Sequence, residues 1–208
     1  VGKSNRTSAI WPGTLRRRDA FLAAIDGMLF GDDPKQGVID GAKFTHPDLR
    51  LSFTAPQGFF MVNSTSAVNI SASGNQTGQA RMTTASYAGD LDGYIRRQFT
   101  ALGGENSALA PQELKRTTVN GLSAAYGSAR VRNGNSQVDV VVFAYEFSRN
   151  RAYHFVVVAP AGQAGTFNSM FQSMRRISQS EANAIMPRRI RIVTVKRGDT
   201  ISGLARGM

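Results

Sequence analysis

The sequence predicts an α+β fold: an antiparallel β-sheet with helices packed on both faces (an α/β/α sandwich), preceded by a helix and a small hairpin. In Ser136–Ala161, two runs of alternating β-branched and aromatic residues flank a short polar break, which is typical of a β-hairpin. Both faces of these runs are apolar, so the strands need cover on both sides. Two amphipathic segments, at residues 91–102 and 166–174, supply helices for that cover.

Residues 1–48 are expected to form a basic arm, a helix and a small β-hairpin. The arm ends in a Trp-Pro-Gly turn at residues 11–13, and Thr14 is the predicted N-cap of the helix. An apolar stripe at helical spacing then continues to Gly31, where the helix is expected to end. Asp40-Gly41 is a favoured hairpin turn pair between two short strands at residues 37–44.

Residues 49–178 are expected to form the sandwich domain. Asp90 is the predicted N-cap of a helix that ends at Gly103-Gly104, and a short helix covers residues 166–174. Asn120-Gly121 predicts the turn of a further strand pair. Besides the two strands of Ser136–Ala161, strands are predicted at residues 49–53 (half-buried), 59–62, 67–72, 79–87, 114–119 and 122–131.

Residues 179–208 are expected to form a basic linker followed by part of a further small element. A strand is predicted to begin at Ile190, and the chain then turns at Gly198. Asp199 or Thr200 is the predicted N-cap of a helix that carries Ile201 and Leu204.

The net charge of +11 is concentrated at the two ends of the chain. Residues 1–18 hold five basic residues and no acidic one, and residues 175–208 hold eight basic and two acidic residues. The charges between them balance. A nucleic-acid binder more often carries a basic stripe interleaved with aromatics on its folded face, so we expect no nucleic-acid partner. Basic ends favour solvated arms, or contact with an acidic neighbour or envelope polymer.

The chain contains no cysteine, and no apolar run approaches the roughly 18 residues that a membrane-spanning helix needs. We therefore expect no disulfide, no thiolate metal site and no membrane-spanning segment. This composition suits an exported bacterial protein as well as a cytosolic one. Because Val1 is not an initiating methionine, we expect the chain to be a processed or excised piece.

Residues 195–205, Val-Lys-Arg-Gly-Asp-Thr-Ile-Ser-Gly-Leu-Ala, resemble the front half of a LysM module. LysM modules are small βααβ domains that bind polymers containing N-acetylglucosamine. The second helix and closing strand of a full module are missing from the sequence. The resemblance implies glycan or partner contacts, for which the candidate residues are Gly198, Asp199 and Thr200 in this element, and Arg188 and Arg189 in the linker.

A larger resemblance covers most of the chain. The helix at residues 18–28, Phe-Gly-Asp-Asp-Pro at 30–34 and His-Pro-Asp-Leu at 46–49 are similar to the region that follows the catalytic domain in bacterial periplasmic zinc-dependent peptidases of the HExxH (gluzincin) type. Those hydrolases often end in the Arg-x-Val-Thr-Val-x-x-Gly-Asp-Thr element found here at Arg191–Thr200. The resemblance implies the non-catalytic C-terminal part of an exported metalloprotease. Residues 49–177 also resemble PsbP-like modules in strand order.

No catalytic motif is present in this chain, so whether it has an activity of its own stays open. HExxH is absent, and the only two histidines are His46 and His154. A zinc site of that class needs two histidines one helical turn apart and a carboxylate. We therefore expect both histidines to be structural or surface residues, and no cofactor in this chain. The zinc implied by the resemblance belongs to an upstream catalytic domain.

These observations give one leading hypothesis and one alternative. The leading hypothesis is a non-catalytic accessory module of an envelope zinc metallopeptidase, used for substrate positioning, docking or regulation, in the periplasm or cell envelope. Its partners would be the upstream catalytic domain of the same protein, and peptidoglycan or an envelope protein. The alternative is a cell-wall (peptidoglycan) binding protein that acts through residues 190–208.

Overall fold

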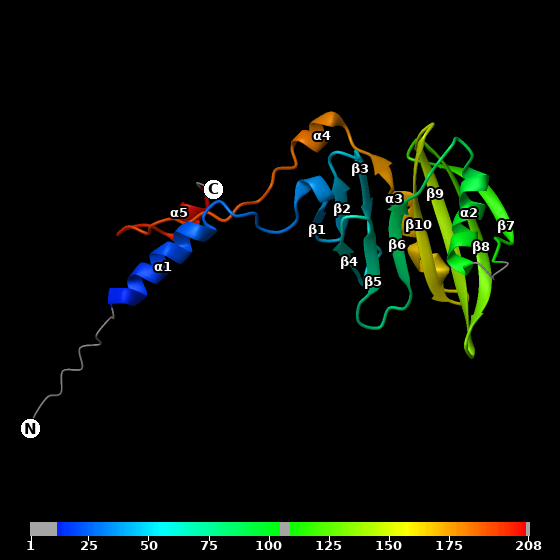
Figure 1. Cartoon of the computed structure of the whole chain (residues 1–208), viewed down its shortest axis with the longest axis horizontal. Coiled ribbons are helices and arrows are strands. Elements are labelled where there is room, and N and C mark those ends of the chain that lie inside the picture. Colours follow the sequence, from blue (N-terminus) through cyan, green and yellow to red (C-terminus); the bar gives the residue numbers. More distant parts are fainter. Residues whose placement is uncertain (1–11, 105–108, 207–208) are drawn as a thin grey trace, which may run out of the picture. The chain divides into compact units, whose positions relative to one another are not determined.

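A computed structural model describes residues 12–104 and 109–206, so most of the expected basic arm lies outside the described residues. The chain divides into two compact units. We call Asp32–Met186 the body, and we call residues up to Gly31 together with Pro187–Met208 the terminal unit. Figure 1 shows the body as the part that contains both β-sheets. Across the described residues, no helix is long and apolar enough to cross a membrane.

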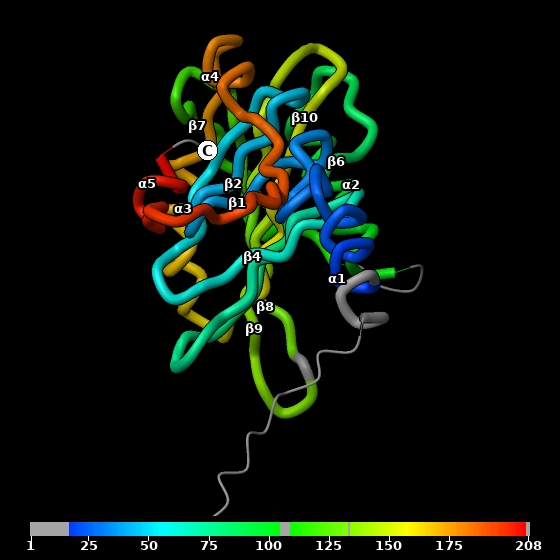
Figure 2. The backbone as a smooth tube through the Cα atoms, turned by 90° about the vertical axis from the view of Figure 1, so that its left-hand side faces the viewer, coloured from blue at the N-terminus to red at the C-terminus, as the bar shows by residue number. Residues whose placement is uncertain are grey.

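The main sheet of the body has seven strands in the order β4-β5-β6-β10-β9-β8-β7. Every pairing in it is antiparallel, as the sequence predicts. Beyond the neighbouring strands, the β8–β9 hairpin continues as a two-stranded tip, seen in Figure 2. The strands are β4 (Phe59–Asn63), β5 (Val68–Ala72), β6 (Gln79–Thr84), β7 (Glu113–Val119), β8 (Leu122–Asn133), β9 (Ser136–Ser148) and β10 (Arg151–Pro160).

The hairpin formed by β9 and β10 lies inside this sheet and is buried on both faces. Val142 and Ala144 are completely buried on one face, and Tyr145 and Phe155 are completely buried on the other. The ladder stays in register along the strands, with one irregularity next to Arg151 at the turn. The prediction that this hairpin needs cover on both sides is therefore confirmed.

Helix α2 (Leu91–Gly103) covers one face of the main sheet, which we call the α2 face. The Asp90 carboxylate caps the helix by accepting hydrogen bonds from the amides of Asp92 and Gly93. Figure 1 shows α2 lying along β8 and β9. The buried side chains of the helix and those beneath it are Leu91, Tyr94, Ile95, Phe99, Ala125, Ala129, Val140, Val142 and Ala144.

The opposite face is covered mainly by a second sheet, so we call it the small-sheet face. Phe53 meets Phe155 edge-on with ring centroids 5.0 Å apart, and Phe171 stacks on Phe143 at 4.7 Å. The covering elements are β1 (Val38–Asp40), β2 (Lys43–His46), β3 (Leu51–Thr54) and β11 (Arg175–Arg176), in sheet order β1-β2-β3-β11, with the 3-10 helix η2 (Ala164–Phe167) and helix α3 (Asn168–Ser173).

The α+β class is thus confirmed, but a sheet provides much of the cover expected from helices. The hairpin at residues 37–44, expected to belong with residues 1–48, pairs through β2 with β3 and is part of the body. The boundary expected after residue 48 therefore falls inside one folded unit. Ser52 is also buried in the strand predicted to be half-buried, because its hydroxyl donates to the Phe44 carbonyl at 2.8 Å.

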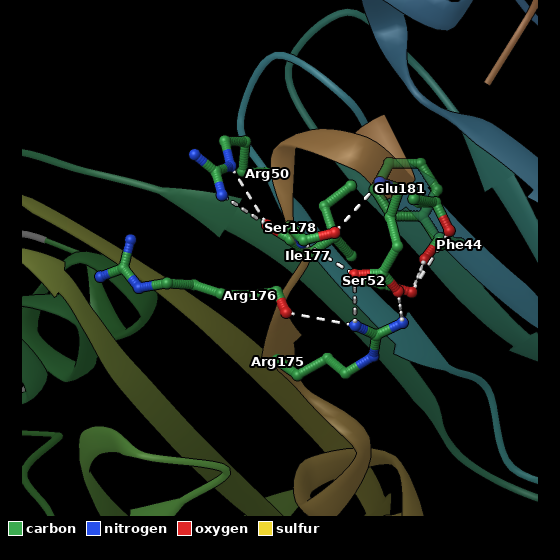
Figure 3. A network of polar contacts seen from close by, with 9 residues as sticks. Phe44, Arg50, Ser52, Arg175, Arg176, Ile177, Ser178 and Glu181 are labelled. Carbon is green, nitrogen blue, oxygen red and sulfur yellow. Dashed lines mark hydrogen bonds and ion pairs between the residues drawn. The ribbon is translucent and has the colours of Figure 1, made fainter. Parts of the chain in front are cut away.

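A network of polar contacts ties the end of the body to the second sheet (Figure 3). The Arg50 guanidinium donates to the carbonyl of Ile177 at 3.1 and 3.0 Å. Arg175 pairs with Glu181 at 2.7 Å, and Glu181 forms a capping box with Ser178 at the start of α4 (Gln179–Asn183). These bonds tie α4 to β11, and they tie the residue after β11 to the residue before β3.

The terminal unit differs from its predicted elements. Helix α1 spans Pro12–Ile25, so Thr14 lies inside it and the helix ends before the expected Gly31. The strand predicted from Ile190 is reduced to one bridge between Leu29 and Arg189. The last helix is formed as α5 (Ile201–Arg206), and a 3-10 helix, η1 (Pro34–Gln36), begins the body.

Removal of the Phe155 ring should destabilise the body strongly. Phe155 contacts Phe53, Tyr145 and Phe171, so Phe155→Ala leaves a cavity between the two sheets and should lower the free energy of unfolding by about 3–5 kcal/mol in urea denaturation. Phe60→Ala on β4 is the matched control, because Phe60 is 51% exposed and its loss should cost roughly 0.5 kcal/mol or less. Equal effects of the two substitutions would contradict this packing.

Candidate functional site

The structure places Arg188 and Arg189 in a paired segment that we call the stem, formed by residues 26–30 and 188–192. The amide of Gly27 donates to the Ile190 carbonyl at 2.8 Å, and the amide of Phe30 donates to the Arg188 carbonyl at 2.8 Å. The Arg189 guanidinium donates to the Gly27 carbonyl at 2.7 Å. These bonds bring together the segments that precede and follow the body in the sequence.

Gly198, Asp199 and Thr200 form a turn that leads into α5. The Asp199 carboxylate accepts a hydrogen bond from the Lys196 amide at 2.7 Å, and the Thr200 hydroxyl accepts one from the Gly203 amide at 3.1 Å. Gly198 has φ 98°, a value that side chains with a Cβ rarely adopt. The turn is therefore preformed, with Thr200 as the helix cap and Asp199 closing the turn before it.

The two histidines lie on opposite sides of the main sheet. His46 is in β2, where its Nδ1 accepts a hydrogen bond from the Leu49 amide at 3.4 Å. His154 is in β10 on the α2 face, where it is only 2% exposed. Among the described residues, no group of three or more His, Cys, Asp or Glu side chains is placed to hold a metal ion. The two histidines therefore do not form a pair of metal ligands with each other.

Each face of the main sheet is covered over only part of its width. On the α2 face, the helix lies over β8 and β9, and Phe60 and Val62 of β4 are 51% and 52% exposed. On the small-sheet face, β1–β3 lie beside β4–β6 (Figure 1), and Ser128 and Arg130 of β8 are exposed. The two open parts are at opposite edges of the sheet, and each contains a groove.

The larger groove, on the small-sheet face, has a cavity volume of about 780 Å³, and we call it the Tyr126 groove. Tyr126 stacks on Phe143 at 5.2 Å with an interplanar angle of 13°, so the floor is aromatic. The Asn120 side chain donates to the Gln172 and Met174 carbonyls at 2.9 Å and holds α3 at its edge. The lining residues are Gln112, Tyr126, Ser128, Ala129, Arg130, Asp139, Val141, Phe143, Ala164, Gly165, Asn168, Phe171 and Gln172.

An ion pair closes one end of the Tyr126 groove. Arg130 and Asp139 are cross-strand partners, and their guanidinium and carboxylate are 2.7 Å apart. The hydrogen bond from Arg130, helped by one from the Gly162 amide, lowers the pKa of the Asp139 carboxyl from its usual value. The groove thus combines an aromatic floor, amide side chains and one charged end, an arrangement suited to binding rather than to bond cleavage.

The smaller groove lies on the α2 face, with a cavity volume of about 510 Å³, and we call it the Arg81 groove. The register of the sheet aligns Val62, Asn69, Arg81 and Val156 across β4, β5, β6 and β10. On the same face, the next row of the sheet toward the β9–β10 turn pairs Thr83 with His154. The lining residues are Asn69, Ile70, Ser71, Gln79, Ala80, Arg81, Thr83, Gln98, Ala101, Leu102, His154, Val156 and Val158.

His154 at the floor of the Arg81 groove is held in its neutral form. The Tyr94 hydroxyl accepts a hydrogen bond from the Ala85 amide at 3.0 Å and lies 2.7 Å from His154 Nδ1. Burial, followed by the nearby Arg81 charge, lowers the pKa of His154 to about 4. Burial raises the pKa of Tyr94 to about 12, so the phenol keeps its proton and is able to donate a hydrogen bond to Nδ1. When Tyr94 donates to Nδ1, the proton of the neutral imidazole is on Nε2.

Neither groove was predicted from the sequence. Their residues come from segments that are far apart in the chain and meet only through the strand order. The alternation in β6 and β10 indicates which side chains share a face, but it does not indicate which part of that face α2 leaves open.

Comparisons with known proteins do not assign the chain to a family. No family model matches the chain, and no curated protein matches it. A solved structure of a protein from Bacteroides thetaiotaomicron is similar to it, with a TM-score of 0.48 and 13% sequence identity. The similarity covers 68% of this chain and 50% of that one, so the chain spans about half the length of this structural neighbour.

The buried neutral His154 should make stability depend on pH. Its pKa is lowered from 6.5 to about 4 in the folded chain, so between these values the unfolded chain binds a proton that the folded chain does not. The free energy of unfolding should therefore fall by roughly 3 kcal/mol as the pH drops through this window. Urea denaturation at pH 7 and pH 4.5 measures the fall, and His154→Gln should reduce it, whereas His46→Gln should reduce it much less. An unchanged pH dependence in His154→Gln would refute the assignment.

Proposed function

We propose that the chain is a non-catalytic accessory module of an envelope zinc metallopeptidase, and that it positions polypeptide substrates for an upstream catalytic domain. The stem is the observation that carries this proposal. Its backbone bonds join the segments before and after the body. The body is therefore a compact unit inserted between two segments that are paired with each other. The family context rests on the resemblance of residues 18–49 and 191–200, and it implies the periplasm or cell envelope.

The Tyr126 groove is the proposed substrate contact within this module. Its aromatic floor at Tyr126 and Phe143 suits apolar side chains of an unfolded polypeptide, and the amides of Gln112, Asn168 and Gln172 suit its backbone groups. The ion pair of Arg130 and Asp139 at one end leaves the groove itself without a large net charge.

Docking to the catalytic domain is assigned to the terminal unit. Phe21 of α1 and Phe30 of the stem are 61% and 63% exposed, and docking would cover these two apolar side chains. The zinc and its ligands would belong to the catalytic domain, and the residues of this chain would act on the substrate only by holding it.

Binding of peptidoglycan through the end of the chain is the second candidate function. The preformed turn at Gly198–Thr200 favours it, as does Ile201 at the start of α5, which is 88% exposed. The basic residues Arg188 and Arg189 lie in the stem, where the Arg189 side chain is engaged by Gly27. In this candidate the glycan would therefore contact residues 198–201 more than the two arginines.

Deletion of the body from a longer protein that also contains the proposed catalytic domain tests the accessory role. The stem brings residues 30 and 188 together, so a short Gly-Ser linker is able to replace Asp32–Met186. This variant should keep kcat/KM for a short peptide within about twofold, but should lose about tenfold or more for an unfolded protein substrate, because remote substrate contacts are lost. Equal loss on both substrates, or no loss on either, would contradict the proposal.

A point substitution tests the contribution of the Tyr126 groove to catalysis separately from that of the rest of the body. Ser128→Arg places a long side chain in the groove and should lower kcat/KM for the unfolded protein substrate severalfold. Ser123→Arg is the matched control, because Ser123 is also exposed on β8 but faces the opposite side of the sheet. Similar kinetics for the two variants would show that the substrate is not held in the Tyr126 groove.

A truncation tests the peptidoglycan candidate. Ile190 and the amide of Ile192 bond to Met28 and Asp26, so a chain that ends at Ile192 keeps the stem and loses only the turn and α5. If residues 193–208 bind the cell wall, the full chain should sediment with purified peptidoglycan and the truncated chain should remain in solution. Equal sedimentation of both, or of neither, would rule out this end of the chain as the binding element.

A further inference from the structure

One ring nitrogen of His154, at the floor of the Arg81 groove, has no partner among the described residues. His154 is 2% exposed, and its hydrogen bond to Tyr94 occupies Nδ1. Within the described residues, every fully enclosed side-chain nitrogen or oxygen has a partner, yet no protein partner of His154 Nε2 is found there. Nε2 therefore reaches the surface of the groove, and with Tyr94 as the donor to Nδ1 it presents an N–H there.

Arg81 supplies a positive charge beside this donor. It is exposed on β6, and the sheet register makes it the diagonal cross-strand neighbour of His154. Of the described residues that line the groove, none is Asp or Glu. A guanidinium and a neutral imidazole N–H that face one space form a donor pair for an anion, and a carboxylate matches the guanidinium geometry.

The other residues that line the Arg81 groove favour a peptide over a fatty acid as its ligand. Val156, Val158 and Leu102 form an apolar wall next to the two donors. Asn69, Ser71 and Gln79 form a polar wall on the other side, and these side chains are able to bond with peptide N–H and C=O groups. A fatty acid would make no hydrogen bonds with that polar wall, so a fatty acid fits the groove less well than a peptide does.

We propose that the Arg81 groove binds the C-terminal carboxylate of a polypeptide whose last side chains are apolar. The carboxylate accepts hydrogen bonds from Arg81 and from Nε2–H of His154, and the last side chains pack on Val156 and Val158. The site is on the opposite face from the Tyr126 groove, and it does not depend on the peptidase context.

Fluorescence polarisation with a labelled nonapeptide that ends in Ser-Val-Leu tests the site. The peptide with a free C-terminal carboxylate should bind, and the same peptide with a C-terminal amide should bind about tenfold more weakly or worse. Arg81→Gln should weaken binding of the free-carboxylate peptide by a similar factor. Arg149→Gln is the matched control, because Arg149 is an exposed arginine in the β9–β10 turn, and it should bind like the unaltered chain.

Imidazole ¹H–¹⁵N spectra supply a readout at His154 itself. They should show the proton on Nε2 before the peptide is added and a shift of that resonance on binding, in a chain that is otherwise unaltered. Equal affinity for the acid and the amide, equal affinity of the two arginine variants, or an unmoved Nε2 resonance would overturn the proposal. Displacement of the peptide by laurate at concentrations below the peptide's own Kd would assign the groove to an acyl chain and overturn it as well.

These results are independent of the peptidase proposal. Failure of the peptide to bind this chain would overturn the Arg81 proposal and leave the Ser128→Arg result untouched. Equal kinetics of Ser128→Arg and Ser123→Arg would overturn the Tyr126 proposal and leave peptide binding untouched.

Discussion

The rest of the body depends on one constraint, which is that the β9–β10 hairpin is apolar on both faces. Val142 and Ala144 on one side, and Tyr145 and Phe155 on the other, must all be removed from water. No single layer is able to do this, so the sheet needs a cover on each face. Helix α2 provides one, and the second sheet with α3 provides the other.

The covers are narrower than the sheet, and that difference in width accounts for both grooves. A seven-stranded sheet is wider than one helix, so α2 leaves β4–β6 open on its face. The second sheet leaves the β7–β8 edge open on the other face. The polar and aromatic side chains at these edges, among them Arg81 and Tyr126, are therefore available to ligands, while the centre of the sheet serves as a scaffold.

The sequence predicts the strands of the main sheet well because their signals are local. Alternation locates β9 and β10, Asn120-Gly121 marks the turn between β7 and β8, and Asp90 marks the start of α2. It does not predict the complete second sheet. β2 and β3 are neighbours in the chain and pair as a local hairpin, but β11 joins β3 only through long-range pairing. For the same reason the sequence does not predict the contact of His154 with Tyr94, which lies 60 residues earlier in the chain. Gly198–Thr200 does form the predicted turn, since its bonds are local.

The reactivity of introduced cysteines tests most directly which parts of the sheet are open and which are covered. The chain has no cysteine of its own that would interfere. Asn69→Cys and Ser128→Cys lie in the two grooves, and Ala144→Cys and Ala124→Cys lie under the covers of the same two faces. We expect the groove positions to react with a maleimide at close to the rate of a free thiol, and the covered positions to react at least about a hundredfold more slowly, because they must wait for local opening. Comparable rates at all four positions, or protection of Asn69→Cys and Ser128→Cys, would contradict the partial cover from which both binding grooves follow.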